Sequence, residues 1–407
     1  MADALSHLRV CDLSGQLAGA GATKILAAFG AEVIRVEDPA TKGLWDALRG
    51  VGPYVDERRG VNLGVGFNNH NVGKRGVTIN FRTDEGRRLL CELIAVSDVV
   101  CENFAAGVLE NRGFGYEELR RIKPDIIYVS NCGFGHSGPY RDFKTWGPIV
   151  QAVSGLTFTS GLPDAEPAGW GYSYMDHASA FYMTVAIMAA LHHRERTGEG
   201  QHVDLATVPA GIALLPTEVL DWTVNGRRTA AGGNRADFGE YAPHGIYPCR
   251  GEDRWIAIAC RDDREMALLA KVLDEPALAS DRFATLIQRL TAVDELDGLI
   301  GAATATREAH SLADDLVGEG VPASVVKSPQ ERIDGDPDLA EFGLFPTVTH
   351  AEIGSVRVEG IPLRFSATPW RIDEAAPTLG QHNRAVLGEL LGHGDEELAE
   401  WAERGVI

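Results

Sequence analysis

The stretch "LRVCDLSGQLAGAGATKILAAFGAEVIRVE", residues 8–37, decides the fold class. The apolar run Leu8–Leu13 has the length of a strand, Ala20–Phe29 carries apolar residues at helical spacing, and Gly30 suits the end of a helix. The segment "EVIRVE" then has the pattern of a second strand. A strand, a helix and a strand in this order form a βαβ unit, which predicts parallel strands joined by a right-handed crossover.

The same alternation continues along the chain. "GVTINF" (76–81) is a further strand, and "TDEGRRLLCELIAVS" (83–97) is a helix for which Thr83 is the expected cap. "DVVCENF" (98–104) and "DIIYVSNCGFG" (125–135) are strands on either side of the helical "GYEELRRI" (115–122), and "QHVDLA" (201–206) adds another strand. We expect one helix over 207–226. This alternation predicts an α/β fold with an open Rossmann-like parallel sheet.

The composition changes at "GRRTAAGGNRADFGEYAPHG" (226–245), which is rich in Gly, Ala and Arg. Beyond it, "RWIAIAC" (254–260) and "GVPASVV" (320–326) are predicted strands on either side of amphipathic helices. A chain of 407 residues is long enough for two domains. We therefore expect a large α/β domain over 1–205, a linker with a Gly-rich loop over 206–239, a small domain over 240–328, and a return linker with the C-terminal part of the large domain over 329–407.

The overall composition narrows the class of protein. The 44% hydrophobic and 24% charged residues are typical of a soluble globular chain. No apolar run reaches the roughly 18–20 residues of a membrane span, and the N-terminus lacks the pattern of a signal peptide, so we expect a cytoplasmic protein with no membrane partner. The net charge of −20 disfavours nonspecific nucleic-acid binding. It also means that a polyanionic ligand needs a local basic cluster.

The cysteines and glycines exclude other chemistry. Six cysteines without a C-x-x-C pair predict reduced, buried thiols rather than a zinc ribbon or a disulfide framework. The glycines of "GQLAGAG" (15–21) follow G-x-x-x-G-x-G spacing, so a tight strand–helix turn is favoured over a dinucleotide site with Glu37 as the ribose acid. The N–H groups at that helix start are still placed to face an anion.

One carboxylate has no obvious partner. Asp176 precedes the apolar run in "GYSYMDHASAFYMTVAIMAALHHRERTGEGQ" (171–201), without a second acid or a metal-ligand cluster beside it. Its position is that of a helix N-cap. The helix dipole favours an ionised carboxylate there, and an ionised carboxylate can act as a nucleophile. The two roles are compatible.

Several long fragments in a fixed order carry a family resemblance. They are "AGAGATKILAAFGAEVIRVEDP", "NVGKRGVTINFRTDEGRRLL", "DVVCENFAAGVLENRGFGYEELRRIKPDIIYVSNCGFG", "YMDHASAFYMTVAIMAALHHRERTGEGQHVDLA" and "APTLGQHNRAVLGELLG". Together they resemble the class III CoA-transferases, which include formyl-CoA:oxalate and carnitine CoA-transferases, over essentially the whole chain. The resemblance implies a CoA-binding large domain, a smaller α/β domain and an interlocked homodimer, with a heteromer as the alternative.

The resemblance also implies an activity: CoA moves from an acyl-CoA to a free carboxylic acid, through covalent aspartyl intermediates and without a metal. Residues 43–71 are similar to the subgroup near benzylsuccinate CoA-transferase, which implies succinyl-CoA as donor and an aryl or dicarboxylic acid as acceptor. The family's nucleophile falls on Asp176. Its CoA contacts fall on Leu17, Ala18, Ile79, Asn80, Phe81, Arg82, Asn103, Phe104, Ala105 and Lys144. By their charge, Arg82, Arg112 and Lys144 are suited to the phosphates, although the family's own arginine aligns with Asn111. Its glycine loop over the site falls on Gly232, Gly233 and Asn234.

Other functions stay open at this point. The related α-methylacyl-CoA racemases place a catalytic His where this chain has Trp146, and α-proton exchange needs a base on each face of the substrate. A non-catalytic CoA-binding subunit, in which Asp176 only caps a helix, is a second alternative. A nicotinamide enzyme is a third.

Overall fold

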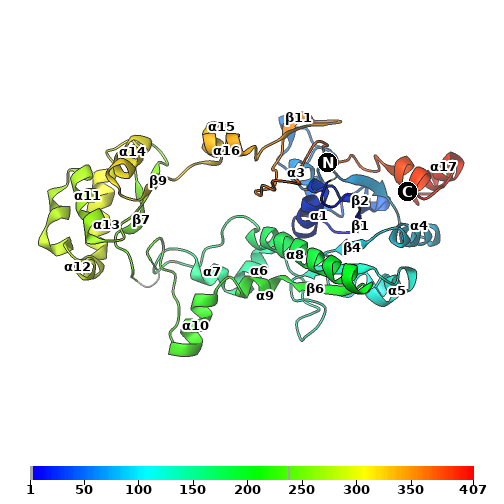
Figure 1. Cartoon of the computed structure of the whole chain (residues 1–407), viewed down its shortest axis with the longest axis horizontal. Coiled ribbons are helices and arrows are strands. Elements are labelled where there is room, and N and C mark those ends of the chain that lie inside the picture. Colours follow the sequence, from blue (N-terminus) through cyan, green and yellow to red (C-terminus); the bar gives the residue numbers. More distant parts are fainter. Residues whose placement is uncertain (1–2, 237–238) are drawn as a thin grey trace. The chain divides into compact units, whose positions relative to one another are not determined.

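The computed structural model describes residues 3–236 and 239–407 (Figure 1). The chain forms two compact units. Unit 1 runs up to Leu156 and contains Gly169–Val219 and Asp338–Ile407, whereas unit 2 contains Thr157–Ala168 and Leu220–Pro337. Residues 237 and 238 of the predicted linker lie outside the described residues.

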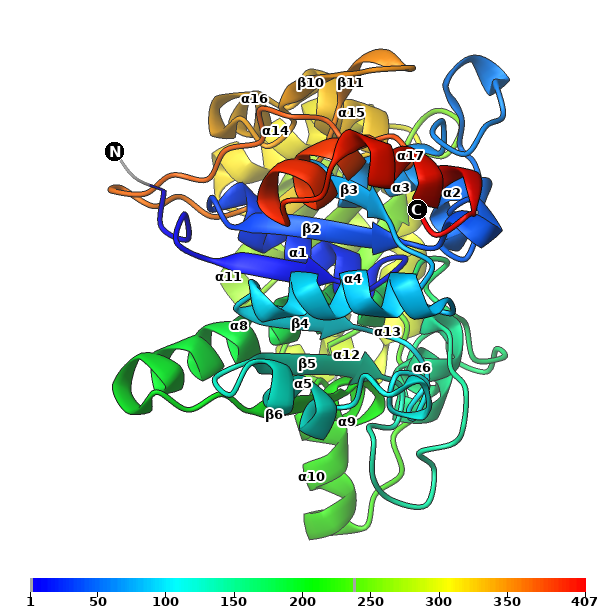
Figure 2. The same ribbon diagram turned by 90° about the vertical axis from the view of Figure 1, so that its right-hand side faces the viewer.

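Unit 1 is built on a six-stranded parallel sheet in the order β3-β2-β1-β4-β5-β6. Figure 2 shows neighbouring strands side by side with their arrowheads in one direction. The strands are β1 (Arg9–Asp12), β2 (Glu32–Glu37), β3 (Arg75–Thr78), β4 (Val99–Glu102), β5 (Ile127–Cys132) and β6 (His202–Ala206). The predicted open α/β sheet is confirmed. The strand order reverses between β1 and β4, where ligands of such sheets bind at the carboxyl ends of the strands.

Helices cover both faces of this sheet, which explains why its strands are apolar on both sides. On one face, α1 (Ala18–Ala28) packs along α8 (Tyr174–Thr197), and their side chains share a buried core with Val10 and Val33. On the other face, the core contains residues of α4 (Asp84–Ala95), α5 (Tyr116–Ile122) and α17 (Asp395–Glu403). The C-terminal segment thus returns to unit 1.

The structure confirms the predicted cap of one helix and the predicted end of another. The Thr83 hydroxyl accepts a hydrogen bond from the backbone N–H of Gly86 at 3.0 Å and caps α4. Gly30 follows α1 with φ of +96°, a left-handed conformation that glycine adopts without steric cost. The prediction of one helix over 207–226 is wrong. The chain forms α9 (Thr207–Ile212) and α10 (Pro216–Asn225) instead, because Pro216 lacks an N–H and disfavours helical geometry at the preceding residue.

The other elements of the chain are short. An antiparallel pair joins β10 (Thr347–His350) and β11 (Gly354–Arg357), and a π-helical turn spans Arg384–Leu390. The short helices are α2 (Ala47–Gly50), α3 (Val65–His70), α6 (Gly147–Ser154), α7 (Leu156–Thr159) and α16 (Pro337–Phe342). Among the described residues, no helix combines the length and the apolar character that a membrane crossing requires. The six cysteines are free thiols, and four of them are buried as predicted, whereas Cys91 and Cys132 are partly exposed.

Unit 2 has its own core around a three-stranded antiparallel sheet. Its strands are β7 (His244–Pro248), β8 (Trp255–Ala259) and β9 (Ala323–Val325), and the predicted strands at 254–260 and 320–326 correspond to β8 and β9. Its helices include α11 (Asp263–Leu273), α12 (Leu286–Thr291), α13 (Val293–Thr304), α14 (Ala309–Glu319) and α15 (Pro329–Gly335). Leu269, Leu296 and Leu312 are fully buried in this core.

Candidate active site

A buried charge network lies at the carboxyl end of β1. Lys74 Nζ is 3.1 Å from Asp12 Oδ2, and it also donates to the Ala20 carbonyl and to Asn71 Oδ1, both at 3.0 Å. Thr23 Oγ1 donates to Asp12 Oδ2 at 2.7 Å. Burial alone would raise the pKa of Asp12, but Lys74 and its other cationic and hydrogen-bonding neighbours hold that pKa below its usual value. The network fixes β1 against α1.

Two hydrogen bonds also join the segments that follow β1 and β4. Gly15 donates its N–H to Asn103 Oδ1 at 2.6 Å, and Asn103 Nδ2 donates to the Gly15 carbonyl at 2.9 Å. A Cβ at Gly19 would lie only 2.2 Å from the Cβ of Ser14, so glycine is required for this turn. Gln16, which follows Gly15, has a left-handed φ of 55° and donates its N–H to Asp46 Oδ2. The turn is therefore rigid and tied to both strands.

A cavity of about 260 Å³ opens at this edge of the sheet. Its walls come from the segments that follow β1, β4 and β5, from the loop before α6, and from the starts of α8 and α9. They are Gln16–Ala18, Asn103–Ala105, Asn131–Gly133, Phe143–Gly147, Val150, Asp176 and Thr207. The structure therefore brings Asp176 together with six of the predicted CoA contacts: Leu17, Ala18, Asn103, Phe104, Ala105 and Lys144.

Asp176 lies in the first turn of α8 rather than at its N-cap, which is Ser173. The predicted N-cap position is wrong because the helix begins two residues earlier, at Tyr174. Burial raises the pKa of Asp176, and the Ser173 hydrogen bond and nearby His177 only partly oppose this. The carboxylate is therefore a poorly solvated anion when ionised. The expected effect of the helix dipole on its ionisation stays a prediction.

Gly147 packs against this carboxylate. It is the first residue of α6, and a Cβ placed on it would lie 2.9 Å from Asp176 Oδ2 and 2.6 Å from Ser173 Oγ. Any side chain here would displace one of the two groups. The absence of a side chain at Gly147 therefore leaves room for the Asp176 carboxylate in the cavity wall.

Asn131 and Thr207 form the polar wall on the side of β5. Asn131 is only 3% exposed, and its Oδ1 accepts a hydrogen bond from Thr207 Oγ1 at 2.9 Å. Its Nδ2 is buried, and no group of the described residues forms a hydrogen bond with it. Burying an unpaired amide donor is costly, and this donor belongs to a residue of the cavity wall.

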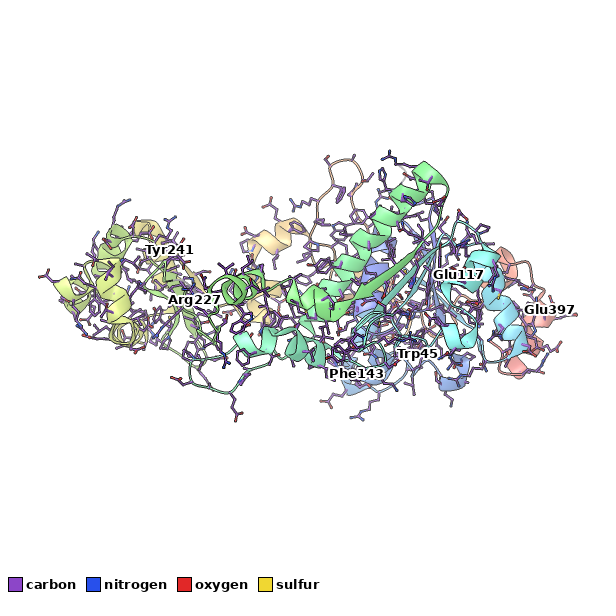
Figure 3. The ribbon with its side chains drawn as sticks, turned by 90° about the horizontal axis from the view of Figure 1, so that it is seen from below. Trp45, Glu117, Phe143, Arg227, Tyr241 and Glu397 are labelled. Atoms are coloured by element: carbon purple, nitrogen blue, oxygen red, sulfur yellow. The ribbon has the colours of Figure 1, made fainter. Side chains whose placement is uncertain are left out.

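A second cavity of about 170 Å³ lies beside the ends of β1, β2 and β3. The aromatic side chains in its wall are Trp45, Phe81 and Phe104. Arg82 and Arg112 also line this cavity. Arg82 forms an exposed ion pair of 3.2 Å with Asp38, and the Arg112 guanidinium lies 5.7 Å from the centre of the Phe81 ring. Predicted contacts Phe81, Arg82 and Arg112 thus meet here, and Phe104 lines both cavities. Figure 3 labels Trp45 and Phe143, which line the second and the first cavity.

Two predicted contacts lie elsewhere. Ile79 is fully buried in the core, and Asn80 holds the C-terminus by donating its backbone N–H to the Val406 carbonyl. Neither lines the two cavities. Glu37, considered above as a ribose ligand, forms a buried two-point ion pair with Arg49. The Glu37 carboxylate therefore stabilises the fold through this ion pair.

The predicted glycine loop belongs to unit 2. Gly233 and Asn234 line a cavity of about 920 Å³ over β7 and β8, and all three loop residues line a neighbouring cavity of about 300 Å³. The Gly233 N–H donates to the Gly161 carbonyl at 3.0 Å, and the Asn234 carbonyl lies 2.6 Å from His244 Nδ1. A role of this loop over a reactive intermediate stays a prediction.

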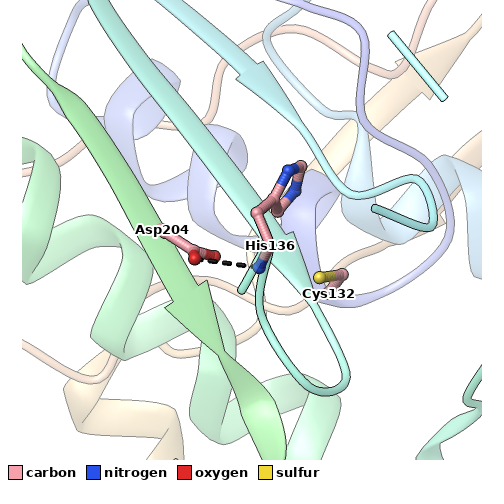
Figure 4. A group of neighbouring side chains, drawn as sticks. All are labelled: Cys132, His136 and Asp204. Carbon is pink, nitrogen blue, oxygen red and sulfur yellow. Dashed lines mark hydrogen bonds between the residues drawn. The ribbon is translucent and has the colours of Figure 1, made fainter. Parts of the chain in front are cut away.

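Cys132, His136 and Asp204 form a cluster next to the first cavity (Figure 4). Their potential ligand atoms lie within 4.8 Å of one another, and the His136 backbone N–H donates to Asp204 Oδ2 at 2.8 Å. The His136 ring also faces Glu110, with Nδ1 2.9 Å from Oε1. Hydrogen bonds to Cys132 and Glu102 raise the pKa of His136 to about 11. The His136 ring forms ion pairs with Glu102 and Glu110.

Sequence reasoning missed many residues of the cavity walls, among them Gln16, Trp45, Asn131 and Thr207. A usable signal was present for two of these four. Asn131 is a polar residue near the carboxyl end of β5, and Gln16 lies four residues beyond β1. Polar residues at the carboxyl ends of parallel strands meet at one edge of the sheet.

Comparisons with known proteins identify the family. A family model described as CoA-transferase family III matches residues 5–383. The chain is 35% identical to a succinyl-CoA–D-citramalate CoA-transferase from Chloroflexus aurantiacus, covering 99% of this chain and 98% of that protein. It is 35% identical to a succinate–glutarate CoA-transferase from Agrobacterium fabrum (95% of each chain) and 32% identical to a formyl-CoA:oxalate CoA-transferase from Streptomyces avermitilis (100% of each).

Two solved structures have a similar fold. A CAIB/BAIF family protein from Brucella suis superimposes with a TM-score of 0.88 at 32% identity, covering 96% of this chain and 100% of that one. A Mycobacterium tuberculosis protein superimposes with a TM-score of 0.78 at 26% identity, covering 94% and 98%. The resemblance seen in the sequence is confirmed, and the chain belongs to CoA-transferase family III, a family of enzymes.

Proposed function

We propose that this protein transfers CoA from an acyl-CoA to a free carboxylic acid, with Asp176 as the covalent nucleophile. The observation that carries the proposal is the position of Asp176 in the wall of a cavity with Leu17, Ala18 and the Asn103–Ala105 segment. A carboxylate that is partly withdrawn from water is less shielded by hydration when it is ionised. Weaker hydration of the anion favours nucleophilic attack.

The proposed chemistry has four balanced steps. Asp176 Oδ attacks the thioester carbonyl, the C–S bond breaks, and CoA leaves as a thiolate from a mixed anhydride. The thiolate then attacks the aspartyl carbonyl, which gives an aspartyl-CoA thioester and frees the donor's carboxylate. The acceptor carboxylate attacks this thioester and releases the thiolate again. Attack of the thiolate on the acceptor's carbonyl yields the new acyl-CoA and restores Asp176.

The second cavity supports the placement of CoA. Its aromatic walls, Trp45, Phe81 and Phe104, suit a flat heteroaromatic ring, and Arg82 and Arg112 supply positive charge in a chain of net charge −20. Guanidinium groups bind phosphates well. Phe104 lies in the walls of both cavities. We therefore propose that the nucleotide end of CoA occupies this cavity and the thioester end faces Asp176.

For the donor and acceptor we propose succinyl-CoA and a dicarboxylic acid. The support is the names of two relatives, the succinyl-CoA–D-citramalate and succinate–glutarate enzymes, which are each 35% identical to this chain. The test is a matrix in which succinyl-CoA, acetyl-CoA and formyl-CoA are each mixed with glutarate, citramalate, malate, oxalate and benzylsuccinate. Mass spectrometry of the acyl-CoA products identifies the exchange, and the Asp176→Ala variant is the control.

The same assay separates the alternatives. A racemase would exchange the α-proton of a chiral acyl-CoA in D₂O without any acceptor acid; Trp146 in the cavity wall, where the racemases carry their histidine, argues against this. A non-catalytic subunit would bind CoA but yield no new acyl-CoA with any pair. Formation of a new acyl-CoA that requires both substrates would support the transferase.

We also propose that the protein works as a homodimer. The outer side of α8 exposes four large apolar side chains: Phe181, Tyr182, Val185 and Met188. Exposed apolar patches of this kind mark association surfaces, and a second copy of the chain would cover them. Light scattering after size-exclusion chromatography tests this, and a monomer at micromolar concentration would contradict it.

A further inference from the structure

The carboxyl end of β5 places an unused hydrogen-bond donor in the wall of the Asp176 cavity. Asn131 is 3% exposed and lines the cavity, and within residues 3–236 and 239–407 its Nδ2 has no hydrogen-bond partner. A buried amide without a partner is rare in folded proteins and calls for an explanation. An incoming ligand with an oxygen acceptor would supply the missing partner.

Thr207 fixes the orientation of this amide. Its hydroxyl donates to Asn131 Oδ1 at 2.9 Å, whereas the alternative acceptor, the Cys132 carbonyl, is farther away at 3.3 Å. Because Oδ1 is the occupied acceptor, the Nδ2 hydrogens are the free groups. Thr207 is itself buried, at 5% exposure, at the start of α9. The donor is therefore held in place before any substrate enters.

We infer that Asn131 is a catalytic residue that donates a hydrogen bond from Nδ2 to the acyl oxygen of the substrate. When Asp176 attacks the carbonyl carbon, negative charge develops on that oxygen. A preorganised donor in a site withdrawn from water stabilises this charge without reorganisation. An uncharged donor also fits the cycle, because it does not trap the carboxylates that bind and leave. The inference rests on the proposed function. It names Asn131 Nδ2 as the hydrogen-bond donor to the acyl oxygen in that reaction.

The test compares three variants with the wild-type enzyme, using the best donor–acceptor pair from the matrix above. Asn131→Asp keeps the shape and the acceptor for Thr207 but removes the N–H donors, and Asn131→Ala removes the whole amide. We expect both to lower kcat by about 10²–10³-fold, the effect of losing one oxyanion donor, with KM changed less than threefold. Thr207→Val keeps the amide but frees its rotation, so it should lower kcat by a smaller factor.

Two outcomes would overturn the inference. One is a kcat within threefold of wild type in a folded Asn131→Ala enzyme. The other is a loss that lies wholly in KM, which would make Asn131 a ground-state binding residue. If wild-type enzyme transfers CoA but these variants keep its kcat, only this inference fails; if the wild type transfers CoA with no pair, the proposed function fails as well.

A spectroscopic measurement covers the case in which the variants fold poorly. The Asp176→Asn protein should bind ¹³C-labelled succinyl-CoA without reacting. We expect the labelled thioester carbonyl stretch to shift to lower frequency on binding, because a hydrogen bond weakens the C=O bond. A bound carbonyl with the frequency of the free thioester would contradict the assignment.

Discussion

The carboxyl ends of β1 and β5 both carry buried polar side chains, but they differ in how completely these groups are paired. At β1, the Lys74 ammonium reaches Asp12, Thr23, Asn71 and a backbone carbonyl within 3.1 Å. At β5, the described part of the chain supplies a partner for the oxygen of the Asn131 amide but none for its nitrogen. The two sites lie at the same edge of one sheet.

This difference separates residues that hold the fold from residues that await a ligand. A buried group with several partners, such as the Lys74 ammonium, contributes to a unique, rigid structure, and removing it costs stability. A half-paired group costs stability in the free protein and gains a partner only on binding. We therefore expect substitutions at β1 to change unfolding and substitutions around the cavity to change turnover.

The largest expected effect is on turnover. Asp176→Asn should lower the exchange rate by roughly 10⁴-fold or more, as loss of a covalent nucleophile does in other enzymes. Its melting temperature should be equal to or above that of the wild type. Folding raises the pKa of Asp176, so the ionised carboxylate is disfavoured by the fold at neutral pH and a neutral amide removes that cost. Residual exchange above a tenth of wild type would reject the nucleophile.

The next effect is on stability. Lys74→Met leaves Asp12 buried without its closest cation, and removing one partner of a buried pair typically costs about 3–5 kcal/mol. Urea unfolding measures this change. The matched control is Arg120→Met, which removes an exposed ion pair with Glu117 and should cost less than about 1 kcal/mol. Equal costs for the two variants would contradict the role of the β1 network.

A smaller effect is expected at Gly147. An alanine there would push against Ser173 and Asp176, and a carboxylate displaced by a fraction of an ångström should lose about 10–100-fold in kcat. The control is Gly298→Ala in α13, where nothing lies within 4 Å of the new Cβ. That variant should keep full activity, and a normal kcat for Gly147→Ala would show that the contact is irrelevant to catalysis.

The smallest effect is a shift in pH dependence. Burial raises the pKa of Asp176, and the protonated carboxyl is not nucleophilic. The acid limb of a kcat/KM profile should therefore have its midpoint above the usual value of an aspartate, with activity lost as the pH falls through it. A profile that stays flat down to the usual aspartate pKa would contradict this environment.

The fold was largely predictable, whereas part of the site was not. Residues 8–37 carry the βαβ pattern locally, because strand and helix periodicities are written in consecutive residues. Asp176 was found through its place before an apolar helix, but its N-cap position was wrong, since the sequence does not show which polar residue begins the helix. Asn131 could have been found as a polar residue near the carboxyl end of a strand, whereas Thr207 was missed because it meets Asn131 only through the pairing of β5 with β6, which no sequence spacing encodes.

The most direct test of the central claim is to trap the acyl group on the enzyme. The protein is incubated with succinyl-CoA without acceptor, treated with hydroxylamine, and digested for peptide mass spectrometry. We predict a hydroxamate at Asp176 in the peptide that contains the start of α8, and none in the Asp176→Asn variant. Turnover of CoA esters with an unmodified Asp176, or with the label on a different residue, would contradict the account.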